Sequence, residues 1–167
     1  MKLVLSEVSN MKKLFILFLC FSLLFCSCVN KGMFNVGNPM SKIDKQYTPY
    51  GDWNFLRAYE INKEHVIVVH DYKNIKKTVT FSSDRKCILN EDVALINNFS
   101  INFFFNMKFD EVKLSIGQPH VDIGSGSYRP SYITEDAYLI SFGVNHNVIS
   151  SVFKYDLLTG DIIDLCY

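Results

Sequence analysis

The sequence predicts an α+β fold in which a short helix packs on an antiparallel β-sheet. Aromatic residues make up 14% of the 167 residues, and the Ile, Val and Phe that favour strands are frequent. Short apolar runs separated by turn residues predict several strands. One later segment has helical spacing with both of its ends marked, which predicts a single amphipathic helix. We expect an export segment and a tether to precede this domain.

The first 28 residues have the pattern of an export signal. Met11-Lys12-Lys13 precedes an apolar run, residues 14–25, that ends in Cys26-Ser27-Cys28. A run of about a dozen apolar residues is too short to span a bilayer permanently, so we expect cleavage; an uncleaved anchor is the alternative. Either way the rest of the chain lies outside the cytoplasm. Residues 1–10 have no signal character, which makes Met11 an alternative start.

The end of this run resembles bacterial lipoprotein signals, in which a small residue precedes the cysteine that is acylated with fatty acids such as palmitate. Cys28 follows the small Ser27, although Phe25 stands where such signals usually have leucine. Cys26 has Leu23 at that place but follows the bulky Phe25. We predict Cys28 as the lipid-attachment residue, with Cys26 as the alternative. The resemblance implies a lipoprotein of the cell envelope, held at the membrane through its N-terminal lipid.

Composition limits the rest of the chain to one domain. Residues 28–167, about 140 in number, are enough for one ordinary core. They carry 14 basic and 16 acidic residues, a balance that does not attract nucleic acid. Residues 29–52 are rich in Asn, Gly, Pro, Ser and Lys without a regular period, which predicts a flexible tether. Residues 53–167 are expected to form the single α+β domain.

The first half of this domain is expected to be a meander of short strands. The predicted strands are residues 55–61, 65–72 and 77–82, with turns at 62–63 and 73–74. Val66-Ile67-Val68-Val69 is continuously apolar, which predicts a central strand covered on both faces. Residues 92–97 fit a helical turn or a strand equally well. Residues 101–105 are too apolar to lie exposed.

The second half is expected to be one helix followed by an antiparallel sheet. Three apolar residues at helical spacing predict a helix over 109–116 with acidic residues in its first turn. We expect Asn106 to cap its start, Gly117 to end it and Pro119 to prevent its continuation. Predicted strands follow at residues 131–134, 138–144 and 148–155, and a last hairpin at residues 156–166.

Residues 106–155 resemble a recurring exported module. Met107, Val112, Gly117 and Pro119, followed by the turn Gly124-Ser125-Gly126, match the pattern of the SmpA/OmlA-like outer-membrane lipoproteins and the related β-lactamase inhibitor protein-like (BLIP-like) fold. The resemblance implies a helix packed on a sheet and a non-enzymatic role in protein binding or envelope assembly, with another envelope protein as the partner.

The match has three departures and one internal echo. Asn106 and Ala137 stand where the pattern usually has glycine, and Lys108 stands where it has threonine. The inhibitor proteins are tandem repeats, and residues 36–39 (VGNP) echo residues 116–119 (IGQP). No amphipathic helix precedes residue 36, so we do not expect this echo to mark a repeat.

The remaining candidates for chemistry are histidines and cysteines. Cys87 and Cys166 could form a disulfide or remain free thiols, and both possibilities stay open. No motif predicts a catalytic residue, a metal site or a cofactor. An alternative function is an exported enzyme or metal-binding protein whose site combines His65 or His70 with His120 and Cys87. It requires that these side chains cluster in the fold.

The remaining candidate site is a surface for protein recognition. Tyr128, Arg129 and Tyr132 follow the glycine turn, and Tyr with Arg is the mixture that anchors many interfaces. These side chains could equally pack on their own sheet, and packing is the better-supported interpretation because aromatic residues of strands are usually structural. A third function, a secreted hydrolase inhibitor, would follow from a protruding loop that carries Tyr128 and Arg129.

Overall fold

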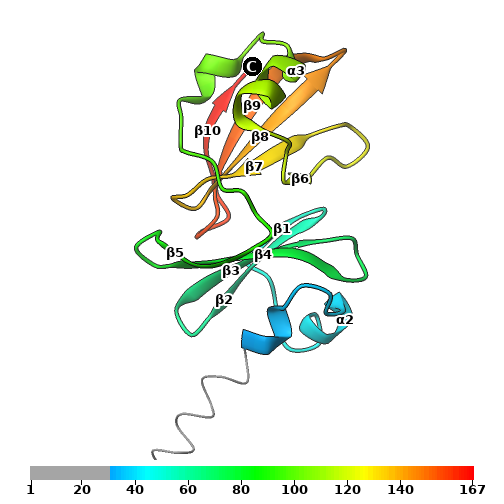
Figure 1. Cartoon of the computed structure of the whole chain (residues 1–167), viewed down its shortest axis with the longest axis vertical. Coiled ribbons are helices and arrows are strands. Elements are labelled where there is room, and N and C mark those ends of the chain that lie inside the picture. Colours follow the sequence, from blue (N-terminus) through cyan, green and yellow to red (C-terminus); the bar gives the residue numbers. More distant parts are fainter. Residues whose placement is uncertain (1–30) are drawn as a thin grey trace, which may run out of the picture. The chain divides into compact units, whose positions relative to one another are not determined.

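Two antiparallel sheets of five strands each dominate the computed structural model, which describes residues 31–167 (Figure 1). Each sheet is a meander, with strands adjacent in sequence also adjacent in space. The prediction of a sheet-rich fold is confirmed, whereas the prediction of one sheet is wrong. The first sheet contains β1 (Gly51–Trp53), β2 (Leu56–Ile61), β3 (Glu64–His70), β4 (Ile75–Ser82) and β5 (Cys87–Glu91). The second contains β6 (Val121–Asp122), β7 (Pro130–Ile133), β8 (Tyr138–Asn145), β9 (Val148–Asp156) and β10 (Ile162–Cys166).

Helical structure is limited to four short segments among the described residues. They are η1 (Lys31–Phe34), α2 (Met40–Ile43), η2 (Ile101–Phe104) and α3 (Phe109–Ile116). Helix α3 has the predicted boundaries, and Gly117 ends it with a φ of 91°. No helix among residues 31–167 is long and apolar enough to cross a membrane. The signal peptide, Cys26 and Cys28 lie outside the described residues.

The first sheet is buried on both faces, with β3 at its centre. On one face the ring centroid of Tyr59 lies 5.5 Å from that of Phe34, beside the buried Met40 and Ile43 of α2. On the other face Leu56 and Ile67 belong to the core shared with the second sheet. The continuous apolar block of β3 is therefore explained, because neither of its faces meets water.

Most of the segment predicted as a tether belongs to the folded domain. The compact unit of the chain begins at Phe34. Met40 and Ile43, spaced one helical turn apart, are both buried, and the Gly37 N–H donates to the Ile75 carbonyl over 2.9 Å. The prediction of a flexible tether over residues 29–52 is therefore wrong for residues 34–52. The Asn, Gly and Pro residues that indicated a spacer form the turns around α2 instead.

A continuous apolar core lies between the two sheets, and a second core lies under α3. The first core joins both sheets and the crossover between them: Leu56, Ala58, Ile67, Val69, Val79, Phe81, Val93, Val121, Ile123, Ile133, Ala137, Leu139, Tyr155 and Leu157. The second packs η2 and α3 on the other face of the second sheet: Ile101, Phe104, Phe109, Val112, Tyr132, Ile140, Phe142, Ile149 and Val152. Residues 34–167 thus form four layers, with helices outside and the two sheets inside (Figure 1).

The start of α3 is capped by a distant residue. Asn147, in the turn between β8 and β9, accepts from the Phe109 N–H through its carbonyl (2.8 Å) and from the Asp110 N–H through Oδ1 (3.2 Å). The N-cap position is Lys108, which makes no side-chain capping bond. The prediction that Asn106 caps this helix is wrong, because its backbone has a φ of 66° and its N–H donates to Ile149.

The two halves share one topology although their sequences do not repeat. Each half has two short helical segments followed by a five-stranded meander, and the last strand of each meander contains a bulge. The echo between residues 36–39 and 116–119 does not mark this repeat. Gly37 lies before α2, whereas Gly117 lies after α3, although both glycines have a φ near 90°.

The crossover between the sheets is held by His120. Residues 92–97, expected as a helical turn or strand, form neither; Ile96 makes one isolated bridge to Thr134. The Ile133 N–H donates to His120 Nδ1 (2.7 Å), so the proton of the neutral ring is on Nε2, which donates to the Ala94 carbonyl (2.7 Å). Burial lowers the pKa of His120 to about 4. The neutral ring therefore joins the crossover to β7.

We expect the stability to fall below pH 6.5 because of His120. Its pKa is about 4 in the folded chain and 6.5 as an ordinary imidazole, so between these values the unfolded chain binds more protons. Above pH 6.5 the neutral His120 ring contributes about 3 kcal/mol to the free energy of unfolding, and this contribution is lost as the pH falls to 4. Urea unfolding at several pH values measures it. His120→Asn should flatten the dependence between pH 4 and 6.5, and the exposed turn variant His146→Asn should not.

Candidate functional site

Of the three side chains predicted to bind a partner, Tyr128 is exposed, Arg129 is partly exposed and Tyr132 is buried. The Tyr128 side chain is 48% exposed, with its ring centroid 5.9 Å from that of Phe109. The Arg129 guanidinium lies over the ring of Phe153 at 4.0 Å. Tyr132 is fully buried, and its hydroxyl donates to the Gly117 carbonyl over 2.9 Å. The prediction of a surface role for Tyr132 is wrong, because it closes the end of α3.

The loop that carries Tyr128 has a fixed backbone. One carboxylate oxygen of Asp122 accepts from the N–H groups of Gly124 and Arg129, each over 2.9 Å. A Cβ at Gly124 would lie 1.6 Å from the Ser127 carbonyl oxygen, and Gly126 has a φ of 88°. Both glycines are therefore required by the tight reversal, which holds Tyr128 in place before any partner arrives.

A second exposed tyrosine joins this loop from the first sheet. Asn54 Nδ2 donates to the Gly124 carbonyl over 2.7 Å, and the Tyr72 hydroxyl donates to Asn54 Oδ1. The Tyr72 side chain is 60% exposed, and its ring centroid lies 4.6 Å from that of Phe55. We name Asn54, Tyr72 and residues 124–128 the tyrosine surface.

Local contacts also fix the backbone at Tyr72. Tyr72 has a φ of 68°, and its N–H donates to His70 Nδ1 over 3.1 Å. Asp71 Oδ1 accepts from the N–H groups of Lys73 (3.0 Å) and Asn74 (2.7 Å). These bonds make a tight turn that projects the Tyr72 ring away from the end of β3. The Asp-x-x-Asn turn signal at residues 71–74 was the one sequence feature that could have indicated this exposure.

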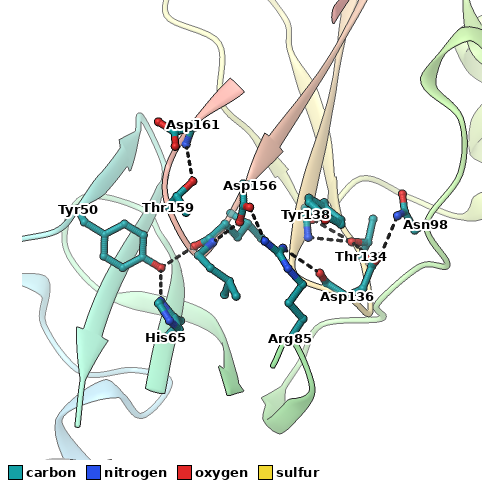
Figure 2. Close-up of polar contacts among 12 residues, drawn as sticks. Tyr50, His65, Arg85, Asn98, Thr134, Asp136, Tyr138, Asp156, Thr159 and Asp161 are labelled. Atoms are coloured by element: carbon teal, nitrogen blue, oxygen red, sulfur yellow. Dashed lines mark hydrogen bonds and ion pairs between the residues drawn. The ribbon is translucent and has the colours of Figure 1, made fainter. Parts of the chain in front are cut away.

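A polar cluster lies at the other end of the contact between the sheets (Figure 2). Arg85, in the turn between β4 and β5, pairs with the carboxylate of Asp156 at the end of β9, and its guanidinium lies 4.6 Å from the ring centroid of Tyr138. Burial alone would raise the pKa of Asp156, but the hydrogen bonds from Arg85 and the Leu158 N–H hold it below its ordinary value. The first sheet is thereby tied to the second by a charged pair.

Tyr50 makes a second tie in the same cluster (Figure 2). Its hydroxyl donates to the Leu157 carbonyl over 2.5 Å and lies 3.0 Å from His65 Nδ1. Since the hydroxyl has one hydrogen, His65 donates its Nδ1–H to the Tyr50 oxygen. Burial and the nearby charge of Asp156 raise the pKa of Tyr50, which keeps this hydroxyl protonated.

The candidate residues for an enzyme or metal site are separated. His65 contacts Tyr50, His70 contacts Tyr72, and His120 binds the crossover. Cys87 is an exposed residue, but partial desolvation of its sulfur raises the pKa of the thiol, contrary to the activated thiolate that this alternative needs. Among residues 31–167 there is no group of three His, Cys, Asp or Glu side chains that could hold a metal ion.

The two cysteines of the folded part are free thiols. Cys87 is exposed at the start of β5, and Cys166 is partly buried at the end of β10. They therefore belong to different sheets. The sequence left open a disulfide or two free thiols, and the structure contains the two free thiols.

Comparisons of the chain with protein-family models, with curated proteins and with solved structures gave no match. The fold and its surfaces therefore carry the functional inference on their own.

We expect the charged pair between the sheets to be needed for stability. Arg85→Met leaves the mostly buried carboxylate of Asp156 without its partner, which should lower the free energy of unfolding by about 2 kcal/mol. Asp156→Asn in the same chain should recover part of that loss. Chemical denaturation of the single and double variants measures both effects. Lys76→Met breaks an exposed pair with Asp71 and should cause no measurable change; an equal loss in Arg85→Met and Lys76→Met would contradict the assignment.

Proposed function

We propose that this chain is a lipid-tethered, non-enzymatic protein of the cell envelope that binds another envelope protein through the tyrosine surface. The observation that carries the proposal is the hydrogen-bonded link Tyr72–Asn54–Gly124, which holds two exposed tyrosines beside one rigid loop. The N-terminal signal with its lipid-attachment cysteine supplies the tether.

The side chains of the tyrosine surface suit protein recognition. Tyr, Ser, Gly and Asn dominate antibody recognition loops, because tyrosine offers a large rigid contact area and the small polar residues supply adaptable hydrogen bonds. The tyrosine surface consists of these four residue types alone. Since the Asp122 carboxylate already orders the loop, little conformational entropy remains to be lost on binding.

Two backbone positions support the resemblance to the SmpA/OmlA-like and BLIP-like proteins. Asn106 and Ala137 replace the glycines usual in that pattern, and they have φ values of 66° and 63°, in the left-handed region that favours glycine. At the N-cap position of α3 the pattern has threonine and this chain has Lys108. Here Asn147, from the turn between β8 and β9, supplies the capping bond instead. The differences from the pattern are therefore compatible with the same backbone.

We expect a partner to be captured from position 128. A photoreactive phenylalanine derivative replaces Tyr128 in the full chain, and intact envelopes are irradiated and examined by mass spectrometry. The expected result is one main protein adduct. Its yield should fall at least fivefold when Tyr72 is also changed to Ala, because both tyrosines are proposed to anchor the same partner.

The matched control places the same photoreactive group at Tyr167, which is exposed on the C-terminal residue. Equal adducts from positions 128 and 167, or no adduct from 128, would contradict a binding role for the tyrosine surface. A hydrolase as the adduct of position 128 would favour the inhibitor alternative over the assembly role.

We expect Cys28→Ser to release the protein from membranes. Without the acceptor thiol the chain receives no lipid, so its intact mass loses the acyl chains and it partitions into the aqueous phase. Cys26→Ser is the matched control and should keep both the lipid mass and the membrane fraction. The reverse pattern would assign the lipid to Cys26, and no effect of either substitution would refute the lipid tether.

A further inference from the structure

Strand β5 is an exposed, apolar edge of the first sheet. It pairs with β4 on one side only, and the side chains of Ile88 and Leu89 are each 47% exposed. Unpaired backbone groups on such an edge can accept another strand. The bulge of β5 places Ile88 and Leu89 together opposite Thr80, so the two apolar residues form the middle of the edge.

Strand β10 has the same topological place in the second sheet, but its edge is protected. The Leu165 N–H donates to Oδ1 of Asp164 over 2.9 Å, which occupies a backbone donor that a new strand would need. Pairing of β10 with another β10 in antiparallel orientation would also bring two Asp164 carboxylates close together. Like charges across a strand pair are destabilising. Self-pairing is therefore opposed at β10.

The charges of β5 have the opposite consequence. Lys86 precedes the strand and pairs with the exposed Asp84 of its own turn. Glu91 ends the strand and accepts from the Thr78 hydroxyl, so the strand itself has a basic start and an acidic end. When two copies of such a strand pair in antiparallel orientation, the basic end of each copy faces the acidic end of the other. Residues 28–167 carry 14 basic and 16 acidic residues, so the small net charge of the processed chain repels a second copy only weakly.

The hydrogen-bond alternation of the first sheet selects a register for this pairing. The Ser82 N–H donates to the Lys86 carbonyl over 2.9 Å, so Lys86 faces β4. By the alternation of an antiparallel ladder, the N–H and C=O of the next residue, Cys87, point away from β4. In the bulge, Ile88 and Leu89 together occupy one position of the ladder. The next backbone N–H and C=O groups that point away from β4 are therefore those of Asn90.

We propose that β5 pairs with β5 of a second copy of this chain, in antiparallel orientation about a two-fold axis between Ile88 and Leu89. In this register Cys87 of each copy lies opposite Asn90 of the other, Ile88 opposite Leu89, and Lys86 opposite Glu91. The two first sheets become one continuous sheet of ten strands. This dimer contact uses no residue of the tyrosine surface, so it adds to the proposed function and does not depend on it.

A disulfide tests the register directly. Asn90→Cys, made in the full chain with Cys166→Ser, places a new thiol opposite the native Cys87 of the second copy, where the Cα atoms of a hydrogen-bonded pair are about 5.5 Å apart. Mild oxidation of intact envelopes should give a disulfide-linked dimer that reductant reverses. A bridge between Cys87 and residue 90 of one chain would leave the protein monomeric under non-reducing conditions, so only the linked dimer reports a contact between copies. Adding Cys87→Ser should abolish the dimer.

Charge exchange tests the same contact without cysteines. Lys86→Glu and Glu91→Lys should each weaken dimerisation of the full chain roughly tenfold, because each places like charges opposite one another at two symmetric positions. The double variant should restore the wild-type dimer. Analytical ultracentrifugation in detergent measures the association, and thermal unfolding checks that each variant folds. Wild-type chain that stays monomeric, a double variant as weak as the singles, or no bridge from Cys87 to the thiol introduced by Asn90→Cys would each overturn the proposal.

Discussion

The burial of both faces of the first sheet is the constraint on which the rest of the fold depends. Its outer face is covered by the segment around α2, and its inner face packs on Ile133, Leu139 and Tyr155 of the second sheet. Two sheets in contact leave the outer face of the second sheet open to water, and η2 with α3 covers it. The four-layer order follows from the need to remove each apolar face from solvent.

The same contact brings polar groups from distant parts of the chain together. At one end, Tyr50 and Arg85 of the first half bind Leu157 and Asp156 of the second. At the other end, Asn54 binds the Gly124 carbonyl and completes the tyrosine surface. Each bond satisfies a group that packing would otherwise strip of water, so the core sets the position of the sheets and these bonds set their orientation.

Local features were predictable from the sequence, and long-range ones were not. The continuous apolar block of β3 and the boundaries of α3, with Gly117 at its end, depend on a few neighbouring residues, and both were predicted. The Asn147 cap, the Asn54 link to Gly124 and the burial of Tyr132 depend on residues between 15 and 70 positions away, for which one sequence has no pattern. Residues 34–52 were misjudged for a related reason: two apolar residues suffice to dock a one-turn helix when a sheet face is already present.

The proposed membrane tether would lower the affinity that the proposed contacts need. Copies held at one surface diffuse in two dimensions at a raised effective concentration, so a contact that is weak in solution becomes populated there. A five-residue edge such as β5 is a weak contact of this kind, and so is a surface built on two tyrosines. The other two edges, β1 and β6, are only three and two residues long, so β5 and β10 are the edges on which a new strand could pair at length. With β10 protected by Asp164, the proposed pairing through β5 closes on itself as a dimer, whereas a long unprotected edge on each sheet would permit open-ended assembly.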